Sequence, residues 1–388
     1  MLLLSIVTGN CTADGSVKNW EFNGFITQGY FDSDHNNFNG KSSSGSTDFR
    51  EIAVNSAWRI SGEVLLAGQV MSRRAGKVDD GDPRMDYLLI DYRFHETGDG
   101  FAGLRIGRIK NPFGFYNTTR DVAFTRPSIV LPQSLYFDKA RDLELSADGA
   151  MLYGRHLLNE GWVESGLIIG KPHKDVSVEY AYLNYDWPGE FDDSRGFLWR
   201  SEYIHQDYSF RAGFTYGQFE LDFDVDGTPA LGAPGDGTVE IDIASFSLQY
   251  NLERWSITGE YMQQFIEWGS LGGIYGLDPK NTSESVYLQA EYRFSPSLSA
   301  FLRYDVLYID KDDRNGNKAA MLFGRPNHTQ FAKDWTLGIG WEPDEHWMLR
   351  AEWHTVQGTA WLAVQDNPSD VERQEEWNMF ALQATYRF

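Results

Sequence analysis

The sequence contains no long apolar run, and its longest candidate is the short stretch Leu2-Leu3-Leu4-Ser5-Ile6-Val7. A membrane-spanning helix needs about 20 mostly apolar residues, so helical membrane spans are excluded. A transmembrane β-barrel stays possible, because each of its strands needs only about 9 to 11 residues and shows apolar side chains at every second position.

Cysteine is almost absent, since Cys11 is the only one in the chain. A disulfide or a cysteine metal site within one chain is therefore excluded. Cys11 falls within residues 1–13, an apolar patch followed by small residues up to Ala13. We interpret these residues as the remnant of a secretory signal peptide, with a disordered N-terminus as the alternative.

Positive charge is scarce: 34 Lys and Arg stand against 56 Asp and Glu, which gives a formal net charge of −22. This balance argues against a nucleic-acid partner, which requires a basic face. Acidic loops at a cell surface rich in divalent cations fit the composition better, and we expect contact there with outer-membrane lipid and lipopolysaccharide.

Catalytic and metal-binding motifs are also missing. No Ser lies in a nucleophile elbow, no His-Glu-x-x-His zinc motif occurs, and the acidic clusters lack the spaced glycine and terminal Glu of an EF-hand. His354 follows closely after Glu352, but a histidine in a barrel lumen explains it better than half of a hydrolase pair. We expect no enzymatic activity, no cofactor and no metal site.

Aromatic residues are abundant, at 15% of the chain, and apolar and polar side chains alternate strictly from Trp20 onward. Aromatic side chains gather at the ends of the apolar faces, which is typical of the two interfaces of a membrane. The pattern predicts an all-β fold, an antiparallel transmembrane β-barrel with long outer loops and short periplasmic turns. The clearest strand places Val286, Leu288, Ala290, Tyr292 and Phe294 on one face, against Tyr287, Gln289, Glu291 and Arg293.

About sixteen strands are expected, because single-chain bacterial barrels have an even strand number. The apolar segment 176–187 would make the total odd, so we place it in an outer loop, 172–194, with a helical turn near 179–185. The predicted strands are 19–31, 50–60, 62–72, 85–94, 101–109, 147–157, 161–171, 195–206, 208–220, 239–252, 254–268, 284–295, 297–309, 332–342, 346–357 and 377–388.

Residues 14–388 show no composition break and are expected to form one barrel. Its last strand has apolar or small residues at every second position and ends on a terminal Phe. This strand resembles the C-terminal targeting strand of outer-membrane proteins, which implies recognition by the barrel insertion machinery. The residues that carry this resemblance are Phe380, Leu382, Tyr386 and Phe388.

The apolar face must point toward lipid, because Arg or Lys there would cost about 2 to 4 kcal/mol at the bilayer midplane. The charged face then lines a hydrated lumen, where opposed Arg and acidic side chains sort ions by sign. The alternative is that these charges merely pair along the wall. The inward set is Arg59, Glu63, Asp91, Arg93, Arg105, Arg155, Glu164, Arg200, Glu202, Arg211, Glu260, Glu291, Arg293, Arg303, Asp305, Arg350, Glu352 and Arg387.

A long interruption, 110–146, follows the fifth strand and carries three prolines, several aromatics and the basic residues Arg120, Arg126, Lys139 and Arg141. General porins have at this position the third outer loop, which folds into the lumen. The stretch from Arg105 to Tyr116, with Lys110 at its centre, resembles the corresponding strand and loop of the phosphate-selective porin family and its relatives. The resemblance implies an inward-folded loop that narrows the pore.

These observations predict a porin of the cell outer membrane, a water-filled channel for passive diffusion of small hydrophilic solutes or ions. We expect a homotrimer, with a preference for anions. The alternative is a barrel with a filled lumen that acts as a scaffold, adhesin or receptor through its outer loops. The residues expected to set constriction and selectivity are Arg105, Lys110, Arg120, Arg126, Arg141, Arg303 and Arg350.

Overall fold

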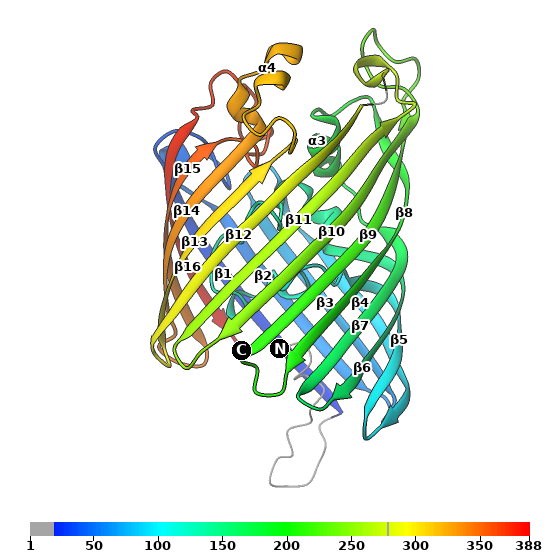
Figure 1. The fold of residues 1–388 in the computed structure, drawn as a ribbon, viewed down its shortest axis with the longest axis vertical. Helices are drawn as coiled ribbons and strands as arrows, with labels where there is room; N and C mark the ends of the chain where they lie inside the picture. The colour runs from blue at the N-terminus through cyan, green and yellow to red at the C-terminus, as the bar shows by residue number, and fades with distance from the viewer. Residues whose placement is uncertain (1–18, 278) are drawn as a thin grey trace.

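The computed structural model describes residues 19–277 and 279–388, so the expected signal remnant 1–13 and Cys11 lie outside the described residues. The described chain forms one closed antiparallel barrel of sixteen strands (Figure 1). The strands are β1 Trp20–Ser33, β2 Ser46–Arg59, β3 Val64–Ala75, β4 Asp79–Thr97, β5 Gly100–Lys110, β6 Ser146–Leu158, β7 Gly161–Pro172, β8 Gly189–His205, β9 Phe210–Val225, β10 Gly237–Asn251, β11 Trp255–Gly269, β12 Lys280–Ser295, β13 Leu298–Tyr308, β14 Phe331–Trp341, β15 Trp347–Gly358 and β16 Glu376–Arg387.

The predicted fold class is confirmed, and each predicted strand corresponds to one observed strand. Each strand pairs with its sequence neighbours, and β1 pairs with β16 to close the ring. Closure satisfies the backbone groups of both terminal strands, which an open sheet edge in lipid would leave unpaired. Tyr30 lies opposite Leu382, and Phe25 lies opposite Arg387, along this seam.

The two faces of the wall differ as the alternation predicts. On β12, Val286 and Leu288 are 40% and 60% exposed, whereas Tyr287 and Gln289 are only 1% and 3% exposed. The side chains on the outer face are apolar and uncovered, as lipid contact requires. The inward face carries the buried charges, among them Glu260 and Arg303.

Short turns join the strands at one end of the barrel, and longer loops join them at the other, except that only residues 76–78 join β3 to β4 there. The 173–188 connection contains the helix α3, Val176–Leu183, which confirms that segment 176–187 is not a strand. Within residues 19–277 and 279–388, the other α-helices are α2, Arg141–Leu145, and α4, Asn317–Phe323. Helices α3 and α4 lie at the end with the long loops, opposite the C-terminus (Figure 1). No helix in the described ranges is long and apolar enough to cross a membrane.

Several strands extend further toward the long loops than the sequence predicts. β8 begins at Gly189 rather than at 195, and β4 runs from Asp79 to Thr97 rather than over 85–94. The backbone pairing of β8 with β9 continues in this outer part. Apolar and polar side chains do not alternate there, because the outward side chains, such as Asp193 and Arg195, are charged. A strand segment that has backbone hydrogen bonds but no apolar face shows no hydrophobic periodicity, so the sequence does not reveal it.

Candidate functional site

The connection between β5 and β6, residues 111–145, packs inside the barrel, against the inner face of the wall, and does not project from the barrel end. No residue from Ile109 to Ala147 is exposed, and Leu135, Tyr136 and Ala123 are fully buried. We call residues 111–145 the inward loop. Its partners come from strands on every side of the ring, so the loop crosses the lumen.

Glu260 on β11 is one anchor of the inward loop. Its carboxylate accepts hydrogen bonds from the Phe115 backbone N–H at 2.9 Å and the Tyr136 hydroxyl at 2.5 Å. On the wall itself, the hydroxyls of Tyr287 and Ser247 donate to the same carboxylate, at 2.7 Å and 2.5 Å. Four donors satisfy the hydrogen-bonding capacity of this buried carboxylate, and the two from the loop hold it against β11.

Glu352 on β15 is a second anchor. Its carboxylate accepts the backbone N–H groups of Ile129 and of Val130, the latter at 3.2 Å. His354 is fully buried behind it, with ring nitrogens 3.3 Å from Glu352 and 2.8 Å from Asp334. His354 thus lies in the lumen wall, as predicted, and supports the carboxylate that holds the loop.

Two predicted site residues, Arg303 and Arg350, hold the same segment of the loop from the wall. Arg303 on β13 donates to the Val130 carbonyl at 2.9 Å and to the Ser128 hydroxyl at 3.2 Å. Arg350 on β15 donates to the Ala123 carbonyl at 2.9 Å. Both guanidinium groups are buried against the loop, so they fix the loop.

The arginines of the inward loop are buried in ion pairs. Arg120 lies 3.1 Å from Asp138 and 3.3 Å from Glu144, and it donates to the Tyr136 carbonyl at 3.0 Å. Arg126 lies 3.7 Å from Glu51 on β2. Burial raises the pKa of Glu144 to about 8, although Arg120 acts in the opposite direction.

Two of the three remaining predicted residues, Lys110 and Arg141, belong to the same network at the root of the loop. The Lys110 ammonium lies 2.6 Å from Asp86 and 2.5 Å from Asp121. Arg141 pairs with Asp121 as well. The structure therefore brings Lys110, Arg120 and Arg141 together, but with carboxylates around each of them.

Arg105 lies elsewhere, among arginines that point inward from β4 to β9 and are only partly buried. We call Arg93, Arg105, Arg155, Arg200 and Arg211 the arginine column. Arg105 pairs with Asp91 at 2.8 Å, and Arg200 pairs with Glu202 at 2.6 Å. Their side chains are between 19% and 30% exposed, so water reaches them.

Aromatic rings support the arginine column from the side. Arg105 lies 4.2 Å from the ring centre of Tyr153, and Arg211 lies 3.8 Å from that of Phe115. Such stacking keeps a guanidinium extended while its edge stays available for hydrogen bonds. The sequence placed all five arginines on the inward face, but only Arg105 was chosen as a site residue. Their recurrence on neighbouring strands was the signal that could have selected the others.

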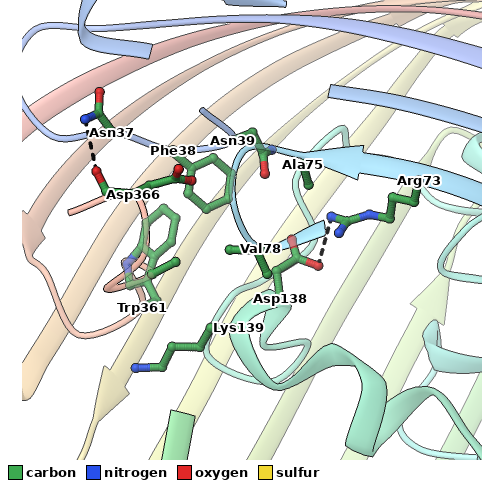
Figure 2. Close-up of a pocket in the computed structure, with 11 residues that line it drawn as sticks. Asn37, Phe38, Asn39, Arg73, Ala75, Val78, Asp138, Lys139, Trp361 and Asp366 are labelled. Carbon is green, nitrogen blue, oxygen red and sulfur yellow. Dashed lines mark hydrogen bonds and ion pairs between the residues drawn. The ribbon is translucent and has the colours of Figure 1, made fainter. Parts of the chain in front are cut away.

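Three other long loops close over the inward loop near the mouth. Trp361 packs edge-on against Phe38, with ring centres 5.2 Å apart, and the Lys139 ammonium donates to the Ala360 carbonyl at 2.8 Å. From α3, the Tyr182 hydroxyl accepts from Gln264 at 3.0 Å. The cavity where residues 37–39, Lys139 and Trp361 meet has a volume of about 20 Å³ (Figure 2). It has room for one water molecule but not for a solute.

The residues of the expected targeting strand lie on the lipid-facing side of β16. Leu382 and Phe388 are exposed, and Phe388 exchanges backbone hydrogen bonds with Gly24 at 3.0 Å and 3.1 Å. The last residue of the chain therefore takes part in closing the barrel.

No protein-family model and no curated protein matches the chain. Solved structures do match. The outer membrane channel DcaP of Acinetobacter baumannii is 11% identical, with a TM-score of 0.59, over 98% of this chain and 99% of that chain. OmpT, an outer membrane protein of Vibrio cholerae, is 13% identical, with a TM-score of 0.58, over 95% and 97%. Salmonella typhi OmpF in complex with daunomycin is 12% identical, with a TM-score of 0.56, over 95% and 97%.

Identities this low show a shared fold and nothing finer. The chain has the sixteen-stranded, closed barrel fold of outer-membrane proteins, among them porins and channels.

Proposed function

We propose that the protein is a channel of the cell outer membrane, through which small hydrophilic solutes or ions diffuse passively past the inward loop. The observation that carries this proposal is the division of the wall. Its outer face is apolar and exposed, whereas its inner face carries partly exposed charges such as Arg105 and Arg155. Charges reached by water within an apolar wall are what a hydrated passage requires. The proposed role is transport and not catalysis.

We further propose that the channel prefers anions through the arginine column rather than through Arg120 and Arg126. Both sets of arginines have carboxylate partners, but the loop arginines are buried, whereas those of the arginine column are partly exposed to water and lie on β4, β5, β6, β8 and β9. This arrangement supports an anion preference and is compatible with the local resemblance to the phosphate-selective porin family. It does not single out phosphate among anions.

A filled barrel that acts as a scaffold, adhesin or receptor is the second candidate. The observation that favours it is the complete absence of exposed residues from Ile109 to Ala147, together with the loops that close over them. In the packed arrangement the middle of the lumen is occupied. Conduction then depends on narrow paths beside the inward loop or on its displacement.

Planar-bilayer recording with purified protein separates these candidates. A channel gives discrete conductance steps, and a salt gradient gives a reversal potential of the sign expected for anions. A cation-selective reversal potential would contradict the anion preference while leaving the channel in place. Absence of any conductance from properly folded protein would favour the filled barrel.

We also propose that the barrel assembles as a homotrimer and is inserted by the barrel insertion machinery through the strand that carries Phe380, Leu382, Tyr386 and Phe388. A trimer form is described for the OmpT structure of Vibrio cholerae, which supports this assembly by analogy of fold. Chemical crosslinking of the protein in native outer membranes tests it.

A further inference from the structure

An open groove with a volume of about 760 Å³ is lined by residues of the loop 309–330 and by the ends of β13, β14 and β15. This loop carries α4, which lies at the rim of the barrel (Figure 1). The floor of the groove includes Tyr308, Lys333 and Gln357. These residues occupy outward positions, because they alternate with the buried inward side chains of Leu307, Asp334 and Val356. We call this site the rim groove, and it opens to the outside of the barrel.

The rim groove lies just above the outer aromatic girdle. Trp335 and Trp353 are 52% and 50% exposed, and Trp335 stacks on Tyr304 with ring centres 4.5 Å apart. Lys333 lies two residues before Trp335 on the same face of β14, a separation of about 6.6 Å along a strand, toward the end of the barrel with the long loops. Aromatic girdles mark the membrane interface, so Lys333 is at the level of lipid headgroups.

Cationic side chains line the rim groove, although the chain as a whole is acidic. Lys311 and Lys333 make no ion pair with any described residue, and Lys333 lies 5.2 Å from the ring centre of Phe331. Lys318 donates to the Asp312 carbonyl at 2.8 Å, and Arg314 pairs with Glu284 at 2.5 Å. Two ammonium groups are thus left for an external anion.

The acidic residues of the rim groove are largely occupied by other contacts. Asp313 accepts the backbone N–H groups of Lys318 and Ala319, at 3.1 Å and 2.9 Å. Glu375 accepts the Gln357 side-chain amide at 3.2 Å. These bonds come from neutral N–H groups and leave both carboxylates charged, but the four cationic side chains of the lining still outnumber its three carboxylates, Asp312, Asp313 and Glu375.

Neutral amides complete the lining. Asn315, Asn317 and Asn327 come from the overhanging loop, and Gln357 comes from β15. Amide side chains both donate and accept hydrogen bonds, which suits hydroxyl groups. Ammonium groups beside amides suit a phosphate attached to a sugar.

We propose that the rim groove binds the phosphorylated sugar headgroup of an outer-leaflet glycolipid, with Lys311 and Lys333 contacting the phosphate. A lipid rather than a free solute is favoured, because the groove faces outward directly above Trp335, where the acyl chains of the same molecule reach the apolar wall. The proposal rests on the outer-membrane location proposed above. It adds a defined lipid site to that location.

Native mass spectrometry of the detergent-solubilised protein tests the proposal, with bis-phosphorylated lipid A as the probe and dephosphorylated lipid A as its control. The test variant is the double substitution Lys311→Ala and Lys333→Ala. Lys171→Ala is the matched control, since Lys171 is an outward lysine at the rim on β7 and is 67% exposed. We expect about tenfold weaker binding of bis-phosphorylated lipid A by the double variant and no change with Lys171→Ala.

Two further arms identify the source of the phosphate. Millimolar inorganic phosphate should not displace the lipid, and dephosphorylated lipid A should bind weakly to all three proteins. Equal affinity of the wild type and the double variant would overturn the proposal, as would an equal loss with Lys171→Ala or displacement by free phosphate. Retention of the folded form on unheated electrophoresis shows that the variants are intact barrels. Binding is measured in detergent, so a protein that binds lipid but fails to conduct refutes the channel and not the lipid site.

Discussion

Ser134, in the middle of the inward loop, donates its backbone N–H to the carboxylate of Asp305 on β13 at 3.2 Å. In the ring of sixteen strands, β13 lies eight strands from β5 in either direction, so it is directly across the barrel from the strand where the loop begins. A loop that reaches the opposite wall divides the lumen, and its attachment decides how much of the lumen is open.

Removing the two carboxylate anchors is expected to open the lumen. A hydrogen bond to a charged group contributes about 1.5 to 3 kcal/mol, and Glu260 and Glu352 together accept four such bonds from the inward loop. The double substitution Glu260→Ala and Glu352→Ala should therefore free the loop and increase single-channel conductance in planar bilayers several-fold.

Glu220→Ala is the control for this measurement, because Glu220 pairs with Arg195 on the outer face of the wall. It should leave conductance unchanged. A double anchor variant that folds but conducts like the wild type would show that the loop does not restrict the path.

The arginine column is expected to set ion preference. Arg105→Ala with Arg155→Ala removes two hydrated cations and leaves the charges of Asp91 and Glu164 without their arginine partners, so the reversal potential in a salt gradient should shift toward cation selectivity. Arg120→Ala with Arg126→Ala should instead act through loop packing, because those arginines are buried among carboxylates and carbonyl groups.

The two pairs therefore separate in one experiment. For the double variant of the arginine column, we expect a shift in selectivity with little change in folding. For the double variant of the inward loop, we expect a less stable folded form and unstable conductance. A selectivity shift seen only in the double variant of the inward loop would mean that Arg120 and Arg126, and not the arginine column, set the anion preference.

The strand order and the lipid-facing side of this barrel could be predicted from the sequence, because both follow from a local two-residue period. Leu288 and Tyr287 are adjacent in sequence and lie on opposite faces, and that alternation needs no knowledge of distant contacts. Parity then assigned segment 176–187 correctly to a loop. The extra length of β8 was missed because its outer end has no apolar face.

The partners of the candidate site could not be predicted in the same way. Burial of Arg126 depends on Glu51, and burial of Arg303 depends on Val130, and both pairs are far apart in sequence. Sequence alternation shows which way a wall residue points, but it carries no information on where a loop of 35 residues comes to rest. A loop arginine therefore looks free in the sequence until its tertiary partners are known.

Loop packing is expected to strengthen between neutral and alkaline pH through Lys139. Burial first, and then the nearby Arg373 and Arg325, lower the pKa of Lys139 from 10.5 to about 7. Between these two values the packed loop binds fewer protons than the unfolded chain, so the free energy of unfolding rises with pH across that window. Below about pH 7 both states are protonated and this contribution stays constant.

The measurement is the temperature at which the folded form is lost on electrophoresis, compared between the wild type and Lys139→Met at pH 7 and pH 10. Other groups titrate in the same window, so the difference between the two proteins is the quantity that matters. The temperature at which the folded form is lost should rise more from pH 7 to pH 10 for the wild type than for the variant. An unchanging difference would mean that the Lys139 ammonium is not desolvated in the packed loop.

The seam between β1 and β16 is expected to depend on Gly24 and Phe388. The Phe388 ring occupies the space where a Cβ of residue 24 would lie, and the Ala53 carbonyl oxygen is 2.9 Å from the same point. Gly24→Leu should displace the ring and weaken barrel closure. Deleting Phe388 removes two backbone hydrogen bonds across the seam and the terminal side chain that the insertion machinery is proposed to recognise.

Refolding in detergent and assembly in cells distinguish these two contributions. Gly24→Leu should reduce the folded fraction in both, because the steric conflict is in the barrel itself. Deletion of Phe388 should reduce assembly in the outer membrane far more than refolding in detergent, where no machinery acts. Phe294→Ala, at an exposed outward Phe on β12 away from the seam, should change neither refolding in detergent nor assembly in the outer membrane. Equal losses of the Phe388 deletion variant in detergent and in cells would assign Phe388 to closure alone.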